Sequence, residues 1–115
     1  MSLRNRVALV TGGSRGIGRG IATRLAQNGA RVAIAYRSNK AAAQQTLRQL
    51  QASGVECVAV ETDISDPVRA EQLVKTVADR FGRLDVVVNN VGDFRWTRWR
   101  KPLWKIGGVF FRRIC

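Results

Sequence analysis

The sequence contains no histidine, only two cysteines and no long apolar run. Without histidine or a group of cysteines, it offers no ligand set typical of a transition-metal site. No apolar stretch approaches the roughly 18 residues of a membrane-spanning helix, and the first six residues lead into a predicted strand rather than a signal peptide. These absences favour a cytoplasmic protein without a metal. Because Cys57 lies in a predicted buried strand and Cys115 is the last residue, we expect free thiols rather than a disulfide.

The charge and the aromatic residues are unevenly distributed. The chain has 115 residues, of which 45% are apolar and 24% charged, a composition typical of one globular domain. Residues 1–92 and residues 93–115 each contribute half of the net charge of +12, and all three tryptophans lie in the second segment. We therefore predict a folded domain at 1–92 and a basic, tryptophan-rich tail at 93–115 with no assigned fold.

Apolar periodicity predicts an alternation of strands and helices before the tail. Strands are expected at 7–10, 31–36, 55–60 and 84–88, and helices at 17–27, 40–53 and 67–81. Ser38 or Asn39 can cap the second helix, and Asp66 with Pro67 begins the third. Such an alternation predicts the α/β class, with a Rossmann-like, doubly wound parallel sheet in the strand order 3-2-1-4. We expect only the N-terminal half of such a sheet.

A glycine-rich turn at residues 11–18 links the first strand to the first helix. Gly12 allows the chain to turn off the strand, Gly16 allows a ligand to approach the backbone, and Gly18 allows the helix to pack closely on the sheet. The N–H groups in the first turn of the helix can then bind a pyrophosphate. A glycine turn alone is weak support, because such turns also serve as plain connections, but here the required strand and helix flank it.

Three motifs together resemble the short-chain dehydrogenase/reductase family, and most closely its bacterial 3-oxoacyl-[acyl-carrier-protein] reductases. They are the pattern Thr-Gly-x-x-x-Gly-x-Gly at 11–18, Asp63 after the third strand, and Asn-Asn-Val-Gly at 89–92. The resemblance implies a dinucleotide site, in which the pyrophosphate would lie along the turn and the adenine against the loop after the third strand. Its implied cofactor-binding residues are Gly12, Ser14, Gly16, Ile17, Gly18, Asp63, Ile64, Asn89 and Gly92. Taken singly, Asp63 could be an ordinary loop cap and Asn89 a turn residue that packs the strand end. Taken together with the glycine turn, the cofactor-binding interpretation is favoured for both.

The end of the second strand indicates which nicotinamide cofactor would bind. An acidic residue there would accept hydrogen bonds from a free ribose 2′-hydroxyl, but Tyr36 occupies the position. Arg37 follows it, and Arg15 lies in the glycine turn, so that two guanidinium groups can flank a 2′-phosphate. We therefore expect NADP(H) rather than NAD(H). The alternative is that both are solvated surface arginines.

The family's catalytic residues are not found where the resemblance would place them. A serine and a Tyr-x-x-x-Lys pair would lie downstream of the Asn-Asn-Ala-Gly element, but neither serine nor tyrosine occurs after Gly92. We assign no catalytic residue and expect no activity from this chain alone. Because the second half of the family fold would be absent, we also expect an exposed edge on the fourth strand, prone to non-native association.

Several interpretations follow from the change in composition after Gly92. One is a shift of reading frame near residues 93–96, which the downstream DNA would test by revealing a Tyr-x-x-x-Lys segment in another frame. The chain could also be a noncatalytic dinucleotide-binding module or a nonfunctional truncated product. A less favoured interpretation is that arginine and tryptophan in the tail bind nucleic acid or a membrane surface. We expect neither as a partner, since basic aromatic segments are nonspecific.

Overall fold

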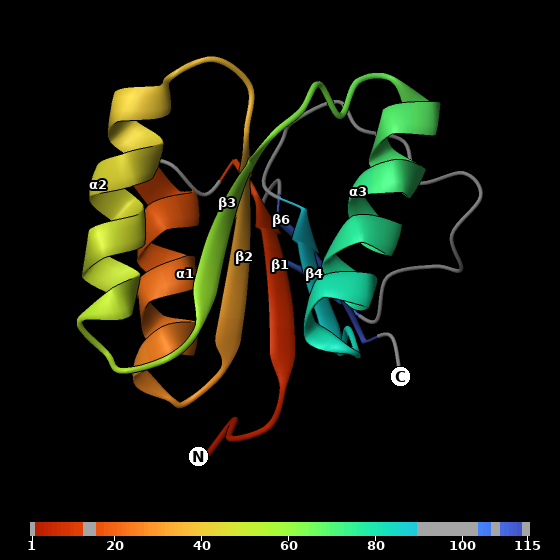
Figure 1. Cartoon of the computed structure of the whole chain (residues 1–115). Coiled ribbons are helices and arrows are strands. Elements are labelled where there is room, and N and C mark those ends of the chain that lie inside the picture. Colours follow the sequence, from red (N-terminus) through yellow and green to blue (C-terminus); the bar gives the residue numbers. More distant parts are fainter. Residues whose placement is uncertain (1, 13–15, 90–103, 107–108, 114–115) are drawn as a thin grey trace.

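The computed structural model describes residues 2–12 and 16–89, and the backbone of two later segments, 104–106 and 109–113. Figure 1 shows a sheet between two layers of helices. The helices are α1 (Gly16–Gln27), α2 (Lys40–Gln51) and α3 (Pro67–Phe81). The strands are β1 (Val7–Thr11), β2 (Arg31–Tyr36), β3 (Cys57–Glu61), β4 (Val86–Asn89), β5 (Trp104–Ile106) and β6 (Val109–Arg113).

The strand order is β3-β2-β1-β4-β6-β5. The first four strands are parallel, which confirms the predicted α/β class and the order 3-2-1-4. β6 pairs antiparallel with β4, and β5 pairs antiparallel with β6. The expectation of an exposed edge on the fourth strand is therefore corrected. A strand edge presents unpaired N–H and C=O groups, and an extended segment that reaches it can satisfy them whatever its composition.

The two faces of the sheet carry separate apolar cores. Figure 1 shows α1 and α2 on one face and α3 on the other. Val10 and Ile34 belong to the core on the α1 and α2 side, whereas Leu9 and Ala33 belong to the core beneath α3. Adjacent strand residues point to opposite faces, so strands covered on both sides must be apolar throughout. That is the pattern from which β1 was predicted.

Local capping sets several helix ends. Of the two candidate caps for α2, Asn39 is the one used, since its side chain accepts a hydrogen bond from the N–H of Ala42. The Asp66 side chain accepts one from the N–H of Val68, and Gly82, in a left-handed conformation (φ 80°), ends α3. These interactions confirm the predicted start and end of α3. α2 ends two residues before the predicted Ser53, an ordinary difference at a helix terminus.

Candidate functional site

A pocket of about 240 Å³ lies at the carboxyl edge of the sheet, where β1, β2 and β3 end. Its lining comes from the ends of the strands and the loops that follow them: Gly12, Ala35, Tyr36, Arg37, Ser38, Asn39, Thr62, Asp63, Ile64 and Ser65. In an open α/β sheet, the crevice beyond the carboxyl ends of the strands is the usual place for a ligand. The pocket is therefore the candidate functional site.

The glycine turn borders this pocket and leaves room beside its backbone. Gly12 has a φ of 66° and donates its N–H to the carbonyl of Ala35 at 2.9 Å, which fixes the turn against β2. Gly16 has a φ of 61°, and a Cβ placed on it would meet nothing within 4 Å. A positive φ favours glycine, and the open space gives a ligand access to the start of α1. Ser14 and Arg15 lie outside the described residues.

The first turn of α1 holds three of the predicted site residues. Gly16 and Ile17 are exposed, and Ile17 retains 70% of its accessible surface, an unusual exposure for a large apolar side chain. Gly18 is buried in the helix, as close packing of the helix on the sheet requires. The amide end of α1 thus projects towards the carboxyl edge of the sheet. This arrangement of N–H groups suits an anionic ligand.

Tyr36 and Arg37, at the end of β2, differ in their surroundings. Tyr36 is 8% exposed and packs in the core on the α1 and α2 side. Arg37 is exposed, lines the pocket and stands three residues before the start of α2 at Lys40. A positive charge near the amide end of a helix adds to the attraction for an anion. This part of the pocket therefore favours a negatively charged group.

The carboxylate of Asp63 is held by the loop that contains it. Its Oδ1 accepts hydrogen bonds from the hydroxyl of Ser65 at 2.6 Å and from the N–H of Ser65 at 3.0 Å. These hydrogen bonds, aided by the positive charges of Arg37 and Arg69, lower the pKa of Asp63. Asp63 thus caps its own loop and also lines the pocket beside Ile64, so both the structural and the cofactor-binding interpretations remain predictions.

Asn89 lies at the end of β4, outside the lining of the pocket. It is 1% exposed, and the Thr11 hydroxyl lies 3.0 Å from its Oδ1 and 3.3 Å from the carbonyl oxygen of Val88. This contact holds the end of the strand, and the role of Asn89 in binding a cofactor stays a prediction. The contact also ties β4 to the residue that precedes the glycine turn. Gly92 lies outside the described residues.

The structure gathers Gly12, Tyr36, Arg37, Asp63 and Ile64 into one pocket. Five residues that were not predicted to belong to the site also line the pocket: Ala35, Ser38, Asn39, Thr62 and Ser65. A usable signal was present, because residues that follow neighbouring parallel strands meet at the same edge of the sheet. Ser38 and Asn39 follow β2, and Thr62 and Ser65 follow β3.

Tyr36 and Lys40 have the sequence spacing of the family's catalytic pair but not its geometry. Lys40 stands four residues after Tyr36, so a formal Tyr-x-x-x-Lys spacing does occur in the chain, upstream of the place where the family has its pair. A spacing of four places two side chains on one face only within a helix. Tyr36 ends a strand and is buried, whereas Lys40 is the exposed first residue of α2. The geometry therefore gives these two residues no catalytic pairing.

No helix in the described ranges combines the length and apolar character needed to cross a membrane. The same residues form no cluster of three or more side chains of the histidine, cysteine, aspartate or glutamate type that could hold a metal ion.

Comparison with known proteins identifies the family. The family model described as short chain dehydrogenase matches residues 6–103, and so extends beyond Gly92 into the tail. An uncharacterized oxidoreductase of Methylorubrum extorquens is 45% identical over 94 residues, which are 82% of this chain and 38% of that protein. A 3-oxoacyl-[acyl-carrier-protein] reductase of Staphylococcus aureus is 44% identical over 88 residues, covering 76% of this chain and 36% of the enzyme.

Two solved structures show how the fold is shared. A short chain dehydrogenase from Burkholderia cenocepacia in complex with NADP superposes with a TM-score of 0.77 at 47% identity, over 83% of this chain and 39% of that one. A short chain dehydrogenase from Mycobacterium paratuberculosis bound to NAD gives a TM-score of 0.73 at 30% identity, over 80% and 38%. The chain spans about two fifths of the length of these relatives. With the family model covering most of its residues, the chain belongs to the short-chain dehydrogenase family.

Proposed function

We propose that this chain is the NADP(H)-binding part of a short-chain dehydrogenase/reductase. The observation that carries the choice of cofactor is the end of β2, where Tyr36 and the exposed Arg37 stand in place of an acidic residue. Relatives in this family are found with NADP and with NAD, so the family alone does not decide between the two. The residues of this chain do favour one of them.

The argument rests on the chemistry of the adenosine ribose. A free 2′-hydroxyl is best bound by a carboxylate at the end of the second strand, whereas a 2′-phosphate needs a cation there. Arg37 supplies that cation on the lining of the pocket, and we propose Arg15 as a second one. Asp63 and Ile64 would then hold the adenine and the first turn of α1 the pyrophosphate. Gly12 and Gly16 leave the backbone accessible there.

The bound cofactor would supply hydride for the reduction of a carbonyl or the reverse oxidation of an alcohol, the chemistry of the family. We propose that this chain alone does not turn over, because neither serine nor tyrosine follows Gly92 and the described Tyr36 and Lys40 do not form a catalytic pair. An assay that follows NADPH absorbance in the presence of a 3-oxoacyl thioester distinguishes an inactive chain from an active reductase. Steady, protein-dependent oxidation of NADPH would contradict the proposed inactivity.

Isothermal titration calorimetry of the full chain with NADPH and with NADH tests the choice of cofactor. We expect tighter binding of NADPH, and Arg37→Ala should weaken it by about 10-fold while leaving NADH unchanged, since a charge-assisted contact is lost. Arg15→Ala should act in the same direction. Arg48→Ala is the matched control, because Arg48 is an exposed cation in the last turn of α2, away from the pocket. An unchanged preference in the Arg15→Ala, Arg37→Ala double variant would refute the assignment.

A further inference from the structure

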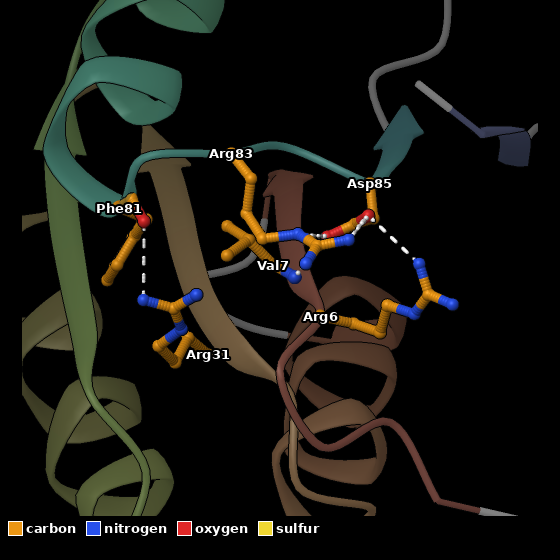
Figure 2. Close-up of polar contacts among 6 residues, drawn as sticks. All are labelled: Arg6, Val7, Arg31, Phe81, Arg83 and Asp85. Carbon is orange, nitrogen blue, oxygen red and sulfur yellow. Dashed lines mark hydrogen bonds and ion pairs between the residues drawn. The ribbon is translucent and has the colours of Figure 1, made fainter. Parts of the chain in front are cut away.

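A buried carboxylate, Asp85, lies at the amino edge of the sheet, the end at which the parallel strands begin. The pocket lies at the opposite end, where these strands terminate. Asp85 immediately precedes β4, and its side chain is only 3% exposed. Figure 2 shows the guanidinium groups of Arg6 and Arg83 directed at it, with the start of β1 beside them. A buried carboxylate is costly unless it is paired and hydrogen-bonded, so its contacts show what it holds in place.

Asp85 and Val7 are joined in both directions. The backbone N–H of Val7 donates to Oδ2 of Asp85 at 2.9 Å, and the backbone N–H of Asp85 donates to the carbonyl of Val7 at 2.9 Å. These two bonds connect residues 78 positions apart in the sequence. Together they fix the start of β1 against the start of β4.

The two arginines complete the coordination of the carboxylate. Arg83 donates from Nε to Oδ2 at 2.8 Å and from Nη2 to Oδ1 at 2.7 Å, a bidentate arrangement, and Arg6 donates from Nη1 to Oδ1 at 3.3 Å. Burial by itself would raise the pKa of Asp85, but the hydrogen bonds from Arg83, Val7 and Arg6 outweigh it and lower the pKa. The group is therefore a charged acceptor at neutral pH.

The register that Asp85 fixes is maintained along β1 and β4 up to the carboxyl edge of the sheet, where the pocket lies. The ladder of β1 and β4 runs from Ala8 opposite Val86 to Thr11 opposite Asn89. A slip by one residue would turn every side chain of β4 to the other face. The contact between Thr11 and Asn89 would then be lost, and with it the link between β4 and the end of β1 that Gly12 follows.

We propose that Asp85 is a positioning residue for the dinucleotide site, which it influences from the far edge of the sheet by fixing the register of β1 and β4. This inference rests on the proposed function, because it concerns the affinity for the cofactor. Asp85 itself touches no part of the pocket. Its effect passes through the β1 and β4 ladder to Thr11, Asn89 and Gly12, which follows Thr11.

The test compares Asp85→Asn with a variant that is destabilised elsewhere. Asparagine preserves the size of the side chain but removes its charge and the bidentate pair with Arg83. Val77→Ala is the control. Val77 is a buried residue of α3, so the substitution leaves a small cavity in the core but does not change the β1 and β4 ladder. At a temperature where both are folded, we expect Asp85→Asn to bind NADPH about 10-fold more weakly and Val77→Ala to stay within about 2-fold of the parent chain.

Amide hydrogen exchange without the cofactor gives a second readout. Asp85→Asn should lose protection at Val10, Val88 and Asn89, in the distant half of the ladder, whereas Val77→Ala should retain it. Folded Asp85→Asn with unchanged affinity would overturn the inference, as would equal weakening in Val77→Ala. If the parent chain bound neither NADPH nor NADH, the proposed function would fail, and hydrogen exchange would still show whether Asp85 fixes the register.

Arg83→Gln keeps the test decisive if Asp85→Asn does not fold. It removes the bidentate pair but leaves the two bonds between Asp85 and Val7 in place. We expect NADPH binding to weaken by about 3-fold and protection at Asn89 to fall in parallel. An unchanged affinity together with unchanged exchange in this variant would overturn the proposal.

Discussion

The two edges of the sheet are built in opposite ways. At the amino edge, Asp85 is buried and accepts four hydrogen bonds, and Arg31 there donates to the carbonyl of Phe81 at 3.3 Å. At the carboxyl edge, the strands end in an open pocket with the exposed Arg37 and a loop in which Asp63 and Ser65 make exposed hydrogen bonds. Parallel strands all begin at one edge and end at the other, which allows one edge to stabilise the fold and the other to bind a ligand.

Removing the buried carboxylate should have the largest effect on stability. Asp85→Ala leaves the N–H of Val7 without this acceptor and places two guanidinium groups beside an apolar methyl group. We expect a loss of about 2–3 kcal/mol in the free energy of unfolding, measured by urea denaturation. Asp79→Ala, at an exposed position of α3, is the matched control and should change little. Equal stability of Asp85→Ala and the parent chain would contradict the assigned role of the amino edge.

The same carboxylate should make stability depend on acid pH. Because the folded pKa of Asp85 is lowered, its contribution is fully present above the unfolded pKa and is lost as the pH falls from about 4 through the folded value. Urea denaturation of the parent chain and of Asp85→Asn should therefore give free energies that differ most near neutral pH and converge in acid. A difference that stayed constant down to strongly acid pH would show that the charge of Asp85 does not stabilise the fold.

A change at the carboxyl edge should separate binding from stability. If Arg37 binds the 2′-phosphate as proposed, Arg37→Ala should reduce the affinity for NADPH by about 10-fold, equivalent to about 1.4 kcal/mol, because a charge-assisted contact is lost. Its midpoint of urea denaturation should equal that of the parent chain, since Arg37 is exposed. A clear loss of stability in this variant would contradict the view that the carboxyl edge serves binding and not stability.

A helix cap at the carboxyl edge sharpens the comparison with a smaller effect. Asp66→Ala removes the acceptor for the N–H of Val68 and should destabilise the chain by about 1 kcal/mol, measured by thermal or urea denaturation. Asp66→Asn is the matched control, because asparagine caps helices about as well as aspartate. Should the asparagine variant lose as much stability as the alanine variant, the charge rather than the cap would be the cause.

Local features made much of the fold predictable. The apolar run of β1, the pair Asp66 and Pro67 and the stop at Gly82 each define an element within a few residues of sequence, and the structure places the elements close to those positions. The glycine turn, Arg37 and Asp63 were found because each follows a predicted strand. Ser38, Asn39 and Thr62 follow the same two strands, so the same signal was available for them, but no sequence motif singled them out.

The sequence by itself determined the order of the elements, the apolar faces of the strands and the motifs that identify the family, since all of these depend on residues close together in the chain. Only the tertiary structure decided the pairing of β6 with β4 and the contacts of Asp85 with Arg6 and Val7. These contacts join residues that are far apart in the chain, and no periodicity encodes them. Their partners are chosen by which backbone edges and charged groups folding brings together.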